Sequence, residues 1–137
     1  MNTEELKART KQFALRVMRL VDALPKSTKS RAIANQIVRS GTSVAANYRA
    51  ACRARSRAEF IARIGVVEEE ADETALWLEL IIADGILGPK KIQPLLIEAN
   101  ELVAIMAASY ISAQKNSRTT GASAPRKSAI RNQQSEI

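Results

Sequence analysis

Apolar side chains recur at steps of three and four residues along four stretches of the chain, which is the spacing of one-sided α-helices. The first stretch covers Glu4–Leu24 and ends before Pro25, because a residue that precedes proline is pushed out of the helical region. Ser27 or Thr28 can cap the second helix, since a hydroxyl there accepts a hydrogen bond from a first-turn amide.

The second half of the chain repeats this pattern twice. Ser56 is placed to cap a third helix, which continues to about Ile82. A fourth helix begins at Pro89 or Pro94, both of which suit a first turn, and its apolar repeat ends near Gln114. Four amphipathic helices with short connections predict an all-α fold, an antiparallel up-down four-helix bundle.

The chain after the fourth repeat has a different composition. From Lys115 onward it is rich in Ser, Thr, Lys and Arg and has no apolar period. Such a segment cannot bury enough apolar surface to fold by itself. We therefore expect one domain, the bundle, over residues 1–115 and a disordered basic tail over residues 116–137.

The stretch Arg39–Ala54 decides how the second helix is interpreted. Residues 40–43, Ser-Gly-Thr-Ser, are poor helix formers. The apolar steps nevertheless keep their phase through Gly41, which predicts one long helix with a small-residue packing face. The positions on that face are Ile33, Ile37, Gly41, Val44, Tyr48 and Cys52. An alternative stays open, in which residues 40–43 form the turn of a helix-turn-helix DNA-binding motif with Val44–Arg55 as its recognition helix.

The second half of the third helix is apolar on nearly all sides. Most of its apolar residues face the bundle, but Leu76 and Leu80 point away from that face and Trp77 projects sideways. A domain of this size has no second core to cover them, so we expect another subunit there. The predicted interface of a homo-oligomer is therefore Leu76, Trp77 and Leu80.

The net charge of +7 is distributed unevenly along the chain. Residues 1–57 carry thirteen Lys and Arg against three Asp and Glu, residues 58–114 carry three against ten, and residues 115–137 carry five against one. A basic surface of this kind suits nucleic acid. Pairing between the basic and acidic parts, within the bundle or between subunits, explains the same pattern, and both interpretations stay open at this point.

Arginines gather on the second helix and in the turn that follows it. A guanidinium is a planar fork that binds phosphate with two hydrogen bonds, which makes these side chains candidates for nucleic-acid contacts. The candidates are Arg39, Arg49, Arg53, Arg55 and Arg57. The other interpretation is a charged exterior that forms salt bridges to the acidic third helix. Arg39 in particular could pair with Glu68, Glu69 or Asp72.

The sequence offers little catalytic chemistry. It has no histidine, no glycine-rich phosphate loop and no nucleophile elbow, and its one cysteine, Cys52, lies on an apolar helix face. We therefore expect no enzyme activity, no cofactor and no metal site. The N-terminus does not resemble a signal peptide, and the longest apolar run, residues 75–83, is too short to span a membrane. These features favour a cytoplasmic protein without a membrane partner.

The block from Gln36 to Ala54, QIVRSGTSVAANYRAACRA, followed by Ser56 and by Glu59-Phe60, resembles the proteins encoded in 23S rRNA intervening sequences. The acidic segment Glu68–Glu73 and an Ala-Asn-Glu-Leu sequence in the last helix fit the same family. The resemblance covers about residues 6–115, and its specific part is the block around residues 36–60.

This resemblance implies an antiparallel four-helix bundle that assembles as a homopentameric ring. It also implies RNA or DNA binding and a protein partner such as a reverse transcriptase, since a relative is the accessory protein of diversity-generating retroelements. It implies no catalytic residues. Our leading expectation is a non-enzymatic oligomeric bundle that binds nucleic acid through a basic surface. The alternative is a ring that binds a protein partner and has no nucleic-acid role.

Overall fold

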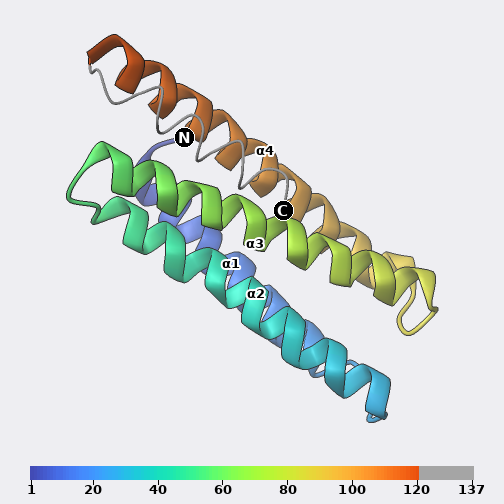
Figure 1. Ribbon diagram of the computed structural model, residues 1–137. Coiled ribbons are helices and arrows are strands. Elements are labelled where there is room, and N and C mark those ends of the chain that lie inside the picture. Colours follow the sequence, from blue (N-terminus) through green and yellow to red (C-terminus); the bar gives the residue numbers. More distant parts are fainter. Residues whose placement is uncertain (121–137) are drawn as a thin grey trace.

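The structure, a computed structural model, describes residues 1–120 and consists over that range of four helices without strands. They are α1 Thr3–Val21, α2 Thr28–Cys52, α3 Arg57–Ala83 and α4 Pro89–Thr120. Consecutive helices run in opposite directions and pack side by side (Figure 1). The structure therefore confirms the all-α, up-down four-helix bundle.

The helix starts follow from local capping. The side chains of Asn2, Ser27 and Ser56 each accept a hydrogen bond from a first-turn amide of α1, α2 and α3. Ser27 and Ser56 confirm the predicted caps. At α3 the Glu59 carboxylate accepts from the amide of Arg55 at 2.6 Å, one residue before the cap that a capping box would use.

The second helix is continuous from Thr28 to Cys52, so the helix-turn-helix alternative is wrong. The small residues mark a packing site within the helix. A Cβ atom on Gly41 would lie 2.9 Å from both Cγ atoms of Val17, so the missing side chain lets α1 and α2 approach closely. Ser40 and Thr74 join their hydroxyls by a buried 2.8 Å hydrogen bond between α2 and α3. Two of the poor helix formers, Ser40 and Gly41, therefore make contacts between helices.

The core receives buried apolar residues from every helix. Fully buried examples are Phe13, Val17, Ile37, Ile64, Leu78, Ile92, Leu102 and Met106. The helix α1 ends three residues earlier than Leu24, because the amides of residues 22–24 bond to carbonyls three positions back. Leu24 itself is buried against the core, so the predicted apolar repeat is correct although the helix is shorter.

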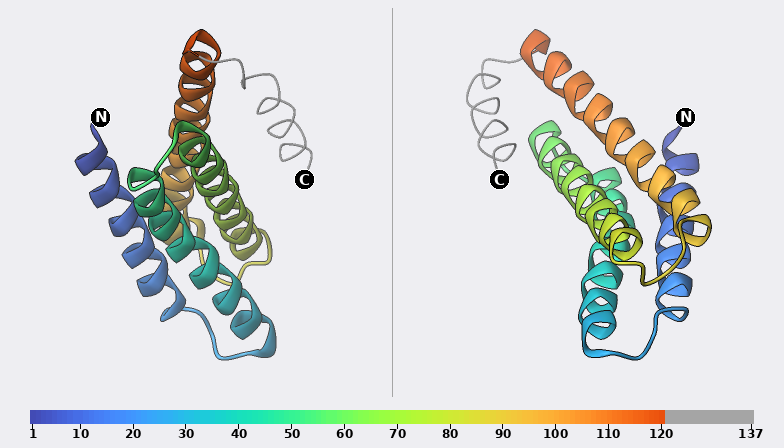
Figure 2. Two further views of the ribbon diagram at one scale, coloured as in Figure 1. Left: turned by 60° about the vertical axis from the view of Figure 1, so that its left-hand side comes forward. Right: turned by 90° about the vertical axis from the view of Figure 1, so that its right-hand side faces the viewer.

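The last helix, α4, crosses the bundle obliquely, and its C-terminal part lies beside α3 and away from α1 (Figure 2). It continues past Gln114, so residues 116–120 of the predicted tail are helical. Residues 121–137 lie outside the described residues. Between Pro89 and Asn116 this helix is long and apolar enough to cross a membrane, a property it shares with many core helices of bundles.

One ionic cluster joins α1 to α4. The guanidinium of Arg9 donates from Nε and Nη2 to both carboxylate oxygens of Glu98, at 2.7 and 2.8 Å, and from Nη2 to Glu101 at 2.6 Å. These hydrogen bonds raise the pKa of Arg9 above its ordinary value. The apolar periodicity of the two helices did not indicate these contacts, because Glu98 and Glu101 follow Arg9 by 89 and 92 residues in the sequence.

Candidate functional site

The candidate arginines occupy one end of the bundle. Arg49 lies in the last turn of α2, Arg53 is the C-cap residue of that helix, and Arg57 is the first residue of α3. Arg55 lies between them in the connection. The two helices bring these four side chains together, and all four are exposed. The start of α1 and the C-terminal part of α4 lie at the same end of the molecule (Figure 1). We call these four residues the arginine cluster.

The arginine cluster carries uncompensated charge. Within the described part of the chain, none of its four side chains forms an ion pair with a carboxylate. Glu59, the nearest acidic residue in sequence, accepts a hydrogen bond from the backbone amide of Arg55 instead. The cluster therefore leaves four guanidinium forks open to a ligand with negative charge.

Helix dipoles act differently on the two halves of the cluster. Arg49 and Arg53 lie at the C-terminal end of α2, where the negative end of the dipole stabilises a cation. Arg57 lies at the N-terminal end of α3, where the dipole disfavours a cation. An anion bound beside Arg57 would interact favourably with both the guanidinium and the helix end. A bound anion would thus offset the unfavourable interaction between the positive charge of Arg57 and the N-terminal end of the α3 dipole.

The fifth candidate, Arg39, lies apart from the cluster and is paired. Its guanidinium contacts Glu73 at 2.6 Å and Glu70 at 3.7 Å on α3. The hydrogen bond to Glu73 is the main cause that raises the pKa of Arg39. Glu73 also accepts a hydrogen bond from the Trp77 indole at 3.1 Å. The charge of Arg39 is therefore largely compensated within the bundle.

Pairing of Arg39 with the acidic helix was one of the two predicted outcomes, but the predicted carboxylates were wrong. The partners are Glu70 and Glu73 in place of Glu68, Glu69 or Asp72. The reason is the rotation of α3: Thr74 faces α2, Glu70 lies one turn before it on the same side, and Glu73 is its immediate neighbour in sequence.

Glu70 provides a pH-dependent contribution to stability. Burial is the main cause that raises its pKa, Arg39 opposes it, and its buried Oε1 atom has no hydrogen-bond partner among the described residues. A raised pKa in the folded state favours the protonated carboxyl. The folded protein is therefore more stable below the ordinary pKa of glutamate than at neutral pH. This extra stability is lost as the pH rises through the folded-state pKa of Glu70.

The substitution Glu70→Gln is expected to raise the free energy of unfolding at pH 7, since it removes the buried charge and keeps the shape. The difference from wild type should shrink toward pH 4, near the ordinary pKa of about 4.3 for glutamate. Urea titrations at the two pH values measure this. A variant that is less stable at pH 7 would show that attraction to Arg39 dominates.

Tyr48 connects the start of α1 to the end of α2 beneath the arginine cluster. Burial is the main cause that raises the pKa of its hydroxyl to about 12; Cys52 raises the pKa further, and Thr3 lowers it. The phenol therefore stays protonated at neutral pH. Cys52 is half-buried beside it, and the two side chains belong to the packing of this end of the bundle.

The predicted interface residues lie on the outer side of α3. Leu76 is 48% exposed and Leu80 is 41% exposed, while Trp77 is half-buried. Leu76 and Leu80 are each two residues from the fully buried Leu78 and lie on the opposite, outer side of the helix, where their exposure is unfavourable unless another surface covers them. Further exposed apolar residues, Ile97 and Ile111, lie on α4. Among residues 1–120 no group of three or more acidic or cysteine side chains converges as a metal site.

Comparison with known proteins agrees with this architecture. The family model of the 23S rRNA-intervening sequence protein matches residues 4–108. The chain belongs to this family. A solved structure from Bacteroides thetaiotaomicron, a protein of unknown function from the S23 ribosomal protein family, is 33% identical with a TM-score of 0.71. The match covers 76% of this chain and 96% of that chain. A search of curated proteins finds no match.

Membership of the 23S rRNA-intervening sequence protein family confirms the resemblance seen in residues 36–60. It accounts for the four-helix fold and leaves the biochemical role open, since the solved relative has no known function. The match to the family model ends at residue 108, before the last turns of α4, so the final 29 residues lie beyond the matched region.

Proposed function

We propose that this member of the 23S rRNA-intervening sequence protein family is a non-enzymatic, self-assembling bundle that binds nucleic acid in the cytoplasm. The single observation that carries the proposal is the arginine cluster, four exposed guanidinium groups at one helix connection without a neighbouring carboxylate partner in the described chain.

Phosphate groups are the ligand that this cluster fits best. Four arginines can form several bidentate hydrogen bonds to a backbone with one charge at each nucleotide. The N-terminal end of α3 adds a favourable dipole for an anion. Contacts to phosphate carry no sequence information by themselves, so we expect binding to RNA, and also to DNA, with little sequence preference. Arg39 is excluded from the proposed contacts, because Glu70 and Glu73 compensate its charge.

Self-assembly is the second part of the proposal. The exposed Leu76 and Leu80 support it, and the family resemblance suggests a ring of five copies. A ring would repeat the arginine cluster on each subunit. Several weak phosphate contacts on one long nucleic acid would then act together, which raises the overall affinity without new contacts.

A second candidate function is an adaptor ring that binds a protein partner, such as a reverse transcriptase, and no nucleic acid. The exposed Ile97 and Ile111 on α4 favour it, since exposed apolar side chains often mark protein contacts. The two functions differ in their response to salt, because phosphate contacts weaken steeply as the salt concentration rises.

The variant Arg49→Ala/Arg53→Ala/Arg57→Ala is expected to bind a structured RNA at least tenfold more weakly than wild type, since each lost phosphate contact removes a charge-assisted hydrogen bond. Fluorescence anisotropy with a labelled RNA hairpin at low salt measures the change, and light scattering checks that both proteins have the same mass.

A matched control is Arg31→Ala/Lys90→Ala/Lys91→Ala, which also removes three exposed positive charges with no described ion pair. These residues lie in the first turns of α2 and α4, at the opposite end of the bundle from the arginine cluster (Figure 1). Equal weakening by the control would show a general charge effect and contradict a site at the arginine cluster.

A further inference from the structure

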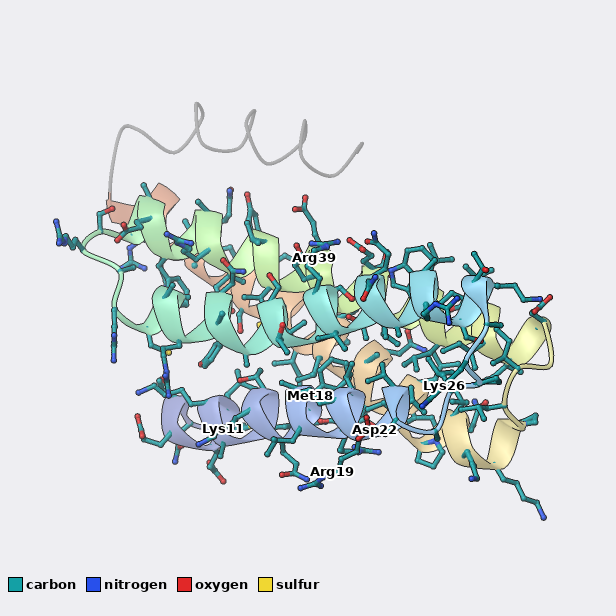
Figure 3. The ribbon with its side chains drawn as sticks, turned by 90° about the horizontal axis from the view of Figure 1, so that it is seen from below. Lys11, Met18, Arg19, Asp22, Lys26 and Arg39 are labelled. Carbon is teal, nitrogen blue, oxygen red and sulfur yellow. The ribbon has the colours of Figure 1, made fainter. Side chains whose placement is uncertain are left out.

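A shallow apolar hollow lies on the outer side of α1 and α2. Its volume is about 380 Å³, and it opens to solvent. The apolar lining consists of Leu15, Met18 and Val21 from α1 and Val38 from α2. Met18 is 47% exposed there and projects between the two helices (Figure 3). An open hollow of this shape suits apolar side chains that project from a helix, rather than an enclosed small molecule.

Positive charge borders this hollow along α1. Lys11 lies one turn before Leu15, Arg19 belongs to the lining, and Lys26 follows the end of the helix (Figure 3). All three side chains are exposed and make no ion pair with a described residue. Asp22 is the one acidic residue in the lining. The hollow therefore fits an apolar surface that is flanked by negative charge.

The outer side of α3 has this complementary character. Leu76 and Leu80 are exposed, and Asp72 and Glu79 lie within one turn of them. Glu69 adds a further exposed carboxylate one turn earlier. The two surfaces combine apolar centres with flanking charges of opposite sign, which is the arrangement that selects a partner and fixes its orientation.

The two surfaces are also free to act at the same time. The helices α1 and α3 lie on different sides of α2 (Figure 3) and do not pack against each other. One copy can therefore present its α3 surface to a neighbour while its hollow receives another. Contacts between two different surfaces of identical chains are heterologous, and they close into a ring when the rotation permits.

We propose that the hollow on α1 and α2 is the docking site for Leu76 and Leu80 of a second copy of this chain. Leu80 or Leu76 fills the space beside Met18 and Val38, and the exposed carboxylates of α3 face Lys11, Arg19 and Lys26. This inference rests on the proposed self-assembly and adds the surface that receives the α3 face.

Two variants, Met18→Asp and Leu80→Asp, test this arrangement. Both positions are more than two fifths exposed, so each variant keeps the core of the bundle. We expect each variant alone to have the mass of a single chain by native mass spectrometry, under conditions where the wild type is assembled. Mixed in equal amounts, they are expected to form a heterodimer, because the mixture retains one intact hollow and one intact α3 surface.

The control is Ile97→Asp on α4, at a residue that is 49% exposed and outside both surfaces; it is expected to keep the wild-type mass. If Met18→Asp keeps the wild-type mass while Leu80→Asp is monomeric, the protein assembles through the α3 surface, but the hollow is not the docking site. If the mixture stays monomeric up to the concentration at which the wild type assembles, the docking inference is overturned. If the wild type is itself monomeric, the proposed self-assembly fails as well.

Discussion

Replacing Gly41 by alanine is expected to destabilise the protein by about 1–3 kcal/mol, the usual range for overpacking a core. The new Cβ atom would lie 2.9 Å from both Cγ atoms of Val17 and 3.0 Å from its Cβ atom. Val17 is fully buried and branched at Cβ, so it has no flexible end that could move aside. In an exposed helix the same change would stabilise by about 1 kcal/mol.

Urea denaturation at one fixed protein concentration measures this effect, since dissociation of an oligomer would otherwise change the apparent stability. The control Gly88→Ala has no atom within 4 Å of the new Cβ and should differ little from wild type. The double variant Val17→Ala/Gly41→Ala is expected to be more stable than the sum of the two single changes predicts. A stabilised Gly41→Ala protein would show that α1 and α2 do not approach as closely as described.

Replacing Arg9 by alanine is expected to destabilise the protein by about 1.5–3 kcal/mol, the range for hydrogen bonds to charged groups. Arg9 and Glu98 have side chains only 23% and 16% exposed, so Glu98 would lose its partner in a poorly hydrated place. The contact between α1 and α4 is otherwise limited, because α4 diverges from α1 (Figure 2).

A matched control for Arg9 is Lys7→Ala on the same helix. Lys7 pairs with Glu4 at 3.1 Å, and the two side chains are 37% and 81% exposed, so this pair should contribute less than about 0.5 kcal/mol. Adding Glu98→Gln to Arg9→Ala is expected to restore part of the stability, because it removes the unpaired charge. Equal effects of Arg9→Ala and Lys7→Ala in urea denaturation would contradict a structural role for the Arg9 cluster.

Local signals in the sequence predicted most of the fold. Ser27 and Ser56 gave the starts of α2 and α3, and Pro25 gave the end of α1 to within three residues, because capping and proline geometry depend on adjacent residues. The unbroken apolar phase through Gly41 correctly predicted a continuous α2, since the period of a helix is itself a local property. The helix-turn-helix alternative failed because the small residues serve packing between helices.

Contacts between distant segments could not be predicted in the same way. The pairs Arg9–Glu98 and Ser40–Thr74 depend on how helices rotate about their axes, which apolar spacing fixes only to within about one residue position. The same uncertainty placed Arg39 beside the wrong carboxylates of α3. Of the five candidate arginines, the structure brings four together at one connection and places Arg39 elsewhere. The hollow beside Met18 has no signal in the sequence, since it requires two helices to be placed together.

The salt dependence of RNA binding tests the central claim most directly. The logarithm of the binding constant is measured against the logarithm of the salt concentration for wild type and for Arg49→Ala/Arg53→Ala/Arg57→Ala. Each lost phosphate contact should reduce the slope by about 0.7–0.9, so the account predicts a clearly shallower line for the variant at unchanged oligomer mass. Parallel lines for the two proteins, or no binding by the wild type at low salt, would contradict it.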